Sequence, residues 1–165
     1  MEELLAGSTS KKIIVVRFDR EPVQGFINPQ SFLQDGGIEL LSASGAVVVL
    51  PYPEVKAVCF VRDFESGPVW REHRAFPNRP KSEGLWLRLH FRDGDTLEGV
   101  IANNLMGLET QGFSVAPPDA GVQIQRVFVP RAALTLVQVL GVVGSPLRRP
   151  AKPKPGEKEQ LKMFE

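Results

Sequence analysis

Few side chains in this sequence could support catalysis or bind a metal. Cys59 is the single cysteine, and it lies in an apolar run, where a cysteine is typically a small buried hydrophobic residue. The two histidines, His73 and His90, have no Cys, Asp or Glu neighbour at the spacing of a metal site. The sequence also has no glycine-rich loop of the phosphate-binding kind. We therefore expect a protein that is not an enzyme and that holds no metal and no cofactor.

A second group of side chains mixes cations with aromatic rings between residues 70 and 81. The candidate nucleic-acid-binding residues are Trp70, Arg71, Arg74, Phe76, Arg79 and Lys81. Such mixtures bind single-stranded nucleic acid, because bases stack on rings while Arg and Lys contact phosphates. The alternative is structural: Trp70 and Phe76 anchor the segment on the folded domain, and the cations face water. Three acidic residues nearby, Glu65, Glu72 and Glu83, dilute the positive charge and favour this second interpretation.

The last residues of the chain contain a candidate protein-binding motif. The side chains expected to bind are Gln160, Leu161, Met163 and Phe164. Residues 160–164 resemble the pentapeptide by which bacterial replication and repair proteins hold the sliding clamp. In that motif a glutamine forms a hydrogen bond and apolar residues fill an adjacent pocket, so the resemblance implies the bacterial sliding clamp as a partner. The alternative is an apolar chain end that packs on the protein's own surface or has no role.

The overall charge argues against a dedicated nucleic-acid-binding protein. Lys and Arg number 20 against 19 Asp and Glu, which leaves a net charge of +1.

The apolar content of 42% is enough for a packed core, and 15 Gly and 14 Pro favour turns over long helices. The start is short and acidic, unlike a signal peptide, and no apolar stretch approaches the ~20 residues of a membrane helix. We expect a soluble, cytoplasmic protein that does not bind membranes.

An internal repeat organises the chain. Matching segments follow one another in the same order: Val16-Arg17-Phe18 with Leu89-His90-Phe91, Gly25 with Gly99, Gly37 with Gly112, and Pro51 with Pro130. A glycine inside a strand marks a bend or bulge, and a proline suits the short turn before a final strand. Alternation of apolar and polar residues predicts strands around these marks. The side chains expected in the core are Ile14, Val16, Phe18, Leu87, Leu89, Phe91, Val127 and Val129.

The repeat predicts an all-β fold of two tandem small barrels with about five strands each, at residues 11–62 and 85–144. A connector loop spans residues 63–84, and a disordered Pro/Lys-rich tail spans residues 145–165. Units of this size bury only a modest core, so we expect the two to pack together.

The second copy resembles the Sm-like proteins. In the segment from Phe91 to Val100, Gly94 and Gly99 have the spacing of the first Sm motif, and the strand–turn–strand ending is similar to the second. The resemblance implies Sm-like or SH3-like barrels, and it covers the first copy only loosely. Sm-like proteins bind RNA with an Asp and an Asn after the second strand and with an Arg-Gly pair, whereas this sequence has Asn103-Asn104 and an Arg131 without the glycine. The barrel is therefore implied and RNA binding is not. Residues 126–131 also resemble an Arg-Val-Phe-Val-Pro-Arg segment of an uncharacterised bacterial family.

Two classes of function follow from the sequence. The first is a non-catalytic binding or adaptor module associated with nucleic acid, with the clamp-binding tail as a further contact. The alternative is a protein-interaction scaffold with no nucleic-acid role, whose barrels meet only proteins, including other copies of the chain. A contiguous positive face would favour the first class, and an exposed apolar surface among mixed charges would favour the second.

Overall fold

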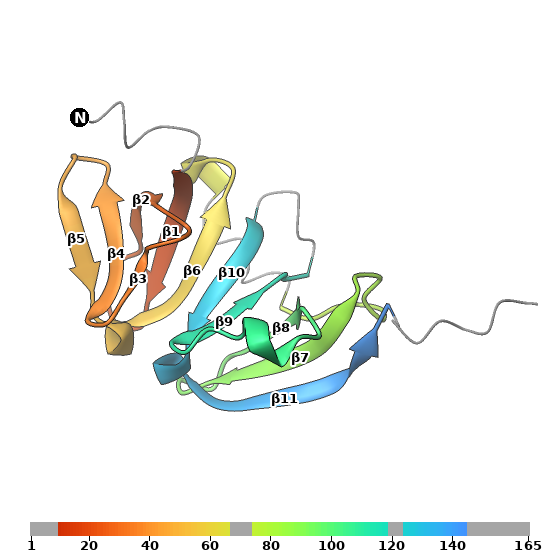
Figure 1. The fold of residues 1–165 in the computed structure, drawn as a ribbon. Coiled ribbons are helices and arrows are strands. Elements are labelled where there is room, and N and C mark those ends of the chain that lie inside the picture. Colours follow the sequence, from red (N-terminus) through yellow and green to blue (C-terminus); the bar gives the residue numbers. More distant parts are fainter. Residues whose placement is uncertain (1–9, 67–73, 119–123, 145–165) are drawn as a thin grey trace, which may run out of the picture.

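The computed structural model describes residues 10–66, 74–118 and 124–144. The strands in chain order are β1 (Lys11–Arg17), β2 (Val23–Ile27), β3 (Leu33–Gln34), β4 (Gly37–Ser42), β5 (Val47–Leu50), β6 (Val55–Val61), β7 (Gly84–Phe91), β8 (Thr96–Ile101), β9 (Gly112–Val115), β10 (Ile124–Pro130) and β11 (Leu134–Val143). They form an eight-stranded sheet and a three-stranded sheet, both antiparallel (Figure 1). The predicted all-β class is confirmed. Among the described residues, no helix has the length and apolar character needed to cross a membrane.

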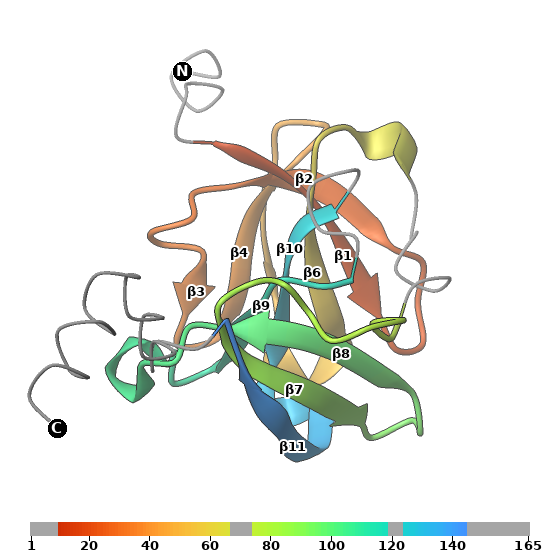
Figure 2. The same ribbon diagram turned by 90° about the vertical axis from the view of Figure 1, so that its right-hand side faces the viewer.

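The two halves of the chain pair their strands in the same order. In the first half the order is β6–β1–β2–β4–β5, and the two-residue β3 lies beside β4 as a sixth strand. In the second half β11–β7–β8 pair, a single bridge from Val100 to Ala116 links β8 to the end of β9, and β9 pairs with β10 (Figure 2). Within the described part, no strand pairing joins β5 to β6 or β10 to β11. The repeated strand order is thus present, while closure into two barrels, and the residue ranges assigned to them, stay predictions.

Glycines mark matching places in the two halves. A Cβ atom on Gly37 would lie 2.2 Å from the carbonyl oxygen of Leu50, and one on Gly112 would lie 2.2 Å from that of Val129. Both distances are impossible for a real Cβ atom, so only glycine lets the neighbouring strand approach this closely. Gly25 and Gly99, which lie inside β2 and β8, are also too close to neighbouring atoms to leave room for a Cβ atom.

Prolines start matching turns. Pro51 (φ −58°, ψ 138°) precedes the 3₁₀ turn η1 (Tyr52–Glu54), and Pro130 (φ −61°, ψ 141°) precedes the 3₁₀ turn η5 (Arg131–Ala133). The fixed φ of proline suits the entry to such a turn. Each turn leads directly into the last strand of its half, β6 or β11.

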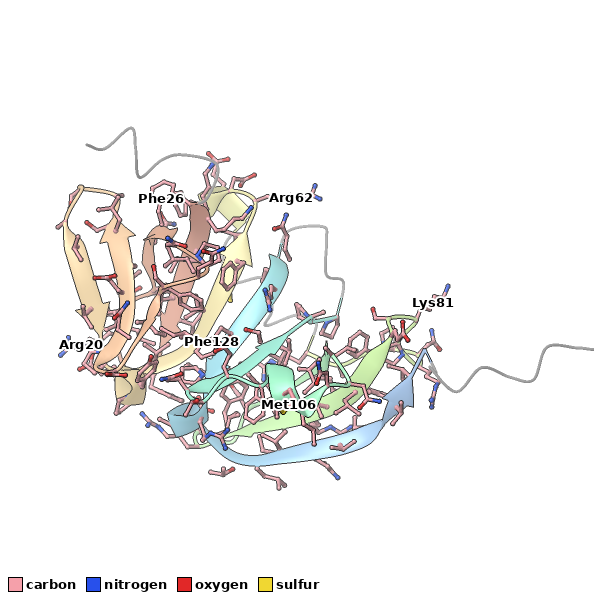
Figure 3. The ribbon with its side chains drawn as sticks, viewed as in Figure 1. Arg20, Phe26, Arg62, Lys81, Met106 and Phe128 are labelled. Atoms are coloured by element: carbon pink, nitrogen blue, oxygen red, sulfur yellow. The ribbon has the colours of Figure 1, made fainter. Side chains whose placement is uncertain are left out.

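The halves are joined by antiparallel pairing of β6 with β10, which lie side by side in Figure 1 and which we call the joint. Phe128 of β10, labelled in Figure 3, is fully buried in the core of the first half. Its ring meets Phe32 edge to face at a centroid distance of 5.7 Å. In return, Ala57, Cys59 and Val61 of β6 pack into the core of the second half. Each half therefore completes the core of the other, as the small size of the units led us to expect.

One segment of the predicted repeat was misaligned. Val15 pairs with Val58, and Leu89 pairs with Val137 at the matching place in the second half. Val15, and not Val16, therefore corresponds to Leu89. A shift of one residue exchanges the two faces of a strand.

The predicted core is confirmed except at one position. Of the eight residues predicted to lie in the core, seven are buried: Ile14, Val16, Leu87, Leu89, Phe91, Val127 and Val129. Phe18 is only partly buried, because it lies beyond the end of β1 and packs against the edge of the second core. Ile14 and Val16 belong to the core of the second half, whereas their neighbours Ile13 and Val15 belong to the first.

Candidate interaction surfaces

The described part of the predicted nucleic-acid-binding segment is attached to the second half of the chain. The Phe76 ring lies edge to face against Trp86 at 6.4 Å. The guanidinium of Arg74 forms an ion pair with Asp95 at 3.1 Å, and Arg79 donates a hydrogen bond to the carbonyl oxygen of Val142. Lys81 is exposed and points away from the strands (Figure 3). Trp70 and Arg71 lie outside the described residues.

A buried carboxylate holds this segment in place. Glu98 is only 5% exposed, and it accepts hydrogen bonds from Trp86 Nε1 at 2.9 Å and from the Phe76 backbone N–H at 3.4 Å. Arg88 forms an ion pair with its second oxygen at 3.3 Å. The Glu98 N–H in turn donates to the Arg74 carbonyl oxygen at 2.7 Å. A buried charge needs such partners, so this network explains how the Glu98 carboxylate can be buried. It also explains how residues 74–79 are anchored.

A second buried charge lies near the joint. The ammonium of Lys56 on β6 contacts the carboxylates of Asp93, at 2.6 Å, and Asp95 in the turn between β7 and β8. It also lies over the Phe91 ring, 5.3 Å from the centroid. Burial acts to raise the pKa of Asp93, but the hydrogen bonds from Lys56 and from the backbone, together with the Lys56 charge, lower it below its usual value. The cluster ties the two halves together.

Matching hollows lie beside the loop that follows the second strand of each half. The first, of about 330 Å³, is lined by polar and apolar residues that include Asn28 and Val47. The second, of about 110 Å³, includes Asn104 and Arg126, the residue that matches Val47. The Oδ1 atoms of Asn28 and Asn104 accept backbone N–H groups two residues later, at 3.0 and 3.1 Å. In both loops the asparagine oxygen therefore holds the loop's own backbone.

Exposed large apolar side chains occur in three places among the described residues. The exposed fractions are 65% for Val47 and 48% for Val49 on β5; 72% for Leu105, 93% for Met106 and 39% for Leu108; and 53% for Leu136, 58% for Val139 and 44% for Val142 on β11. We call Leu105, Met106 and Leu108, which lie at the 3₁₀ turn η4 (Leu105–Gly107), the apolar loop; Met106 is labelled in Figure 3. Apolar groups gathered in this way are typical of surfaces that bind other proteins.

Residues 9–141 match the model of a protein family described as "Family of unknown function (DUF6982)". The chain belongs to this family. No curated protein and no solved structure matches the chain. The prediction of an uncharacterised family is confirmed, and the segment of residues 126–131 lies inside the DUF6982 match. The comparisons give no support to the Sm-like resemblance, which stays a prediction.

The described part of this DUF6982 chain has no group of three or more His, Cys, Asp or Glu side chains that could hold a metal ion. Cys59 is buried at the joint, where desolvation raises the pKa of its thiol to about 12. His90 shares a hydrogen bond of 3.2 Å with Gln138.

Four predicted binding residues lie outside the described part of the chain, and several exposed apolar residues were not predicted. The predicted motif Gln160, Leu161, Met163 and Phe164 falls outside the described residues. The sequence interpretation did not single out the apolar loop or the exposed valines of β5 and β11. The available signal for the loop was Leu105-Met106 directly after Asn103-Asn104, because apolar residues are unusual in a polar turn. The strands gave no such signal, since a run of apolar residues is equally typical of a buried strand.

Proposed function

We propose that this chain is a non-catalytic binding module whose partners are proteins, as in the alternative predicted from the sequence. The apolar loop is the observation that carries the proposal. Met106 is 93% exposed and Leu105 is 72% exposed, although water is an unfavourable environment for both side chains. Methionine is a flexible apolar side chain that suits protein-binding surfaces.

The apolar loop is held in one conformation before any partner arrives. Asn104 Oδ1 accepts the Met106 backbone N–H at 3.1 Å, and the Gly107 N–H donates to the Asn104 carbonyl oxygen at 3.1 Å. A loop ordered in advance loses less conformational entropy when it binds, so more of the apolar contact energy appears as affinity.

The charges support a protein partner over nucleic acid. Arg74 is paired with Asp95, Arg88 with Glu98, and Arg79 donates to a backbone carbonyl oxygen. Phosphate binding would compete with each of these contacts, which reduces the free energy available from phosphates. Single-stranded nucleic acid therefore remains the weaker proposal for this segment. The sliding clamp, itself a protein, remains the proposed partner of the tail, in the cytoplasm.

The test is capture of partners from native lysate by full-length protein, with and without nuclease. We expect capture of proteins other than the sliding clamp and further copies of the chain to survive nuclease, to be lost when Leu105 and Met106 are both changed to Ser, and to persist when Lys81 is changed to Ser. Loss of all partners on nuclease treatment, or equal capture by the Leu105→Ser/Met106→Ser variant, would contradict the proposal. In the first case, reduced capture by Lys81→Ser would favour nucleic acid.

A further inference from the structure

Among the described strands that pair on one side only, β5 and β11 stand out because they are apolar and longer than the two-residue β3. β5 pairs only with β4, and β11 pairs only with β7 within the described part of the chain. Neither strand contains a charged residue: β5 reads VVVL and the ten-residue β11 reads LTLVQVLGVV. Proteins usually protect such edges with charges, prolines or very short strands, because an uncharged apolar edge pairs readily with another strand.

The joint shows which kind of strand fits each edge. β11 is the second-half counterpart of β6, because Val139 pairs with Leu87 as Phe60 pairs with Ile13. β5 is the first-half counterpart of β10, because Leu50 pairs with Ile38 as Val129 pairs with Phe113. Since β6 and β10 pair with each other in the joint, the two unpaired edges are the counterparts of two edges that already fit together.

Burial shows what the joint does for each strand. All seven residues of β6 are buried, whereas only Val143 is buried among the ten residues of β11. Phe128 of β10 is fully buried, whereas its counterpart on β5, Val49, is 48% exposed. The members of each pair occupy the same place in the fold. What differs is that β6 and β10 have the other half of the chain against them.

We propose that copies of this chain associate head to tail, with β5 of one copy pairing antiparallel to β11 of the next. The joint gives the register. Phe128 lies opposite Val58, and Val127 lies opposite Cys59. Transferred to the counterparts, the expected pairs between copies are Val49 with Val137, Val48 with Gln138 and Val47 with Val139. The most exposed large apolar residues of the two strands, Val47 on β5 and Val139 on β11, then lie directly opposite each other.

This interface joins two different surfaces, so each added copy leaves one β5 edge and one β11 edge at the ends of the assembly. Such heterologous contacts grow until the chain of copies closes into a ring, or form an open filament. The inference goes beyond the proposed function, because the partner is a second copy and the edges are separate from the apolar loop.

The first experiment measures the mass of the full chain in solution by sedimentation. Wild type should sediment as multiples of 18.2 kDa. Val47→Glu blocks one edge and Val139→Glu blocks the other, because each buries a carboxylate in an apolar interface; both residues are more than half exposed in the single chain, so its fold should persist. Each variant alone should be monomeric, and an equal mixture should form a dimer and nothing larger, since one usable edge of each kind remains. Thr110→Glu, at an exposed position outside β5, β11 and the apolar loop, is the matched control and should assemble like wild type.

The second experiment tests the register. A chain carrying both Val47→Cys and Val139→Cys should form disulfide-linked multimers on mild oxidation, because directly opposite residues of antiparallel strands lie within disulfide reach. Native Cys59 is buried and should not compete. A chain with Val47→Cys and Leu136→Cys keeps two exposed thiols out of register and should link far less. Monomeric wild type at hundreds of micromolar, assembly by the mixture beyond a dimer, or equal linking by both cysteine pairs would overturn the proposal.

Discussion

Lys56 is almost completely buried on β6, where its ammonium contacts two carboxylates, Asp93 and Asp95. Breaking such a pair on one side costs more than the pair contributes, because the remaining buried charge loses its partner. The same reasoning applies to Glu98 with Arg88 and Trp86. The contacts of Lys56 hold the β7–β8 turn in place, and those of Glu98 hold residues 74–79 in place.

At the residue scale, acid should remove the contribution of Asp93. Its pKa in the folded chain lies below the usual 3.8, so this group contributes stability above that pH and loses the contribution as the pH falls through the lowered pKa. Asp93→Asn should therefore reduce the free energy of unfolding at neutral pH, and the difference from wild type should shrink below about pH 4. Urea unfolding at a series of pH values measures this. A difference that stayed constant down to pH 2 would show that the carboxylate charge has no part in it.

Cys59 gives a second residue-scale prediction. Burial raises the pKa of its thiol to about 12, so at pH 8 only about one thiol in 10⁴ would be ionised even if a reagent could reach it. A thiol reagent should label the folded chain no faster than the joint opens, and it should label the urea-unfolded chain at once. Rapid labelling of folded protein would mean that β6 and β10 separate readily.

At the element scale, the close approach of neighbouring strands depends on Gly112. Gly112→Ala should lower the free energy of unfolding by about 1–3 kcal/mol, because the new Cβ atom would overlap the Val129 carbonyl oxygen and force β9 and β10 apart. Gly36→Ala is the matched control: nothing lies within 4 Å of its added Cβ atom, and we expect a change within about 0.5 kcal/mol. Equal effects of the two substitutions in urea unfolding would refute the steric explanation.

The sequence was most informative where one residue type has a single structural use. Glycine and proline correctly predicted matching places in the two halves, because Gly37 and Gly112 have no room for a side chain and Pro51 and Pro130 start identical turns. The face of β1 could not be predicted. Ile13 faces one core and Ile14 the other, so the strand lacks the apolar–polar alternation that identifies a buried face.

The exposure of the edge strands β5 and β11 could not be predicted from the sequence, for a related reason. β6 and β11 are both apolar strands that follow a proline-led turn, yet one is entirely buried and the other mostly exposed. The difference comes from which half of the chain lies alongside, and this depends on tertiary packing. The contacts of Glu98 were also not predicted, because its donors come from two segments: Trp86 and Arg88 lie on β7, and Phe76 lies before it.

At the scale of the whole molecule, the two halves should unfold together because they share side chains across the joint. Phe128→Ala should lower the free energy of unfolding by about 3–5 kcal/mol, since it empties a fully buried site in the core of the other half. Circular dichroism during urea unfolding should show one transition for wild type and an earlier one for the variant. Met106→Ala, at a side chain that is 93% exposed, should change the free energy of unfolding by no more than about 0.5 kcal/mol. A variant that lost only half of the signal early would mean that the halves are independent.

The tail gives the last prediction, and it concerns how the whole molecule reaches a second protein. Residues 160–164 follow a Pro- and Lys-rich segment, a composition that cannot form a core of its own. A synthetic peptide of residues 157–165 should bind a bacterial sliding clamp at micromolar concentration, about −8 kcal/mol. Replacing Leu161 and Phe164 with Ala should abolish binding, because each removes an apolar anchor, and Gln160→Ala should weaken it through a lost hydrogen bond. Lys162→Ala is the matched control and should bind like wild type, since this position is expected to face solvent. Full-length protein should lose clamp binding when truncated after Pro146 and keep its self-association, because β5 and β11 remain. If the full-length chain ignores the clamp, or binds it equally well without Leu161 and Phe164, the resemblance of the tail is accidental.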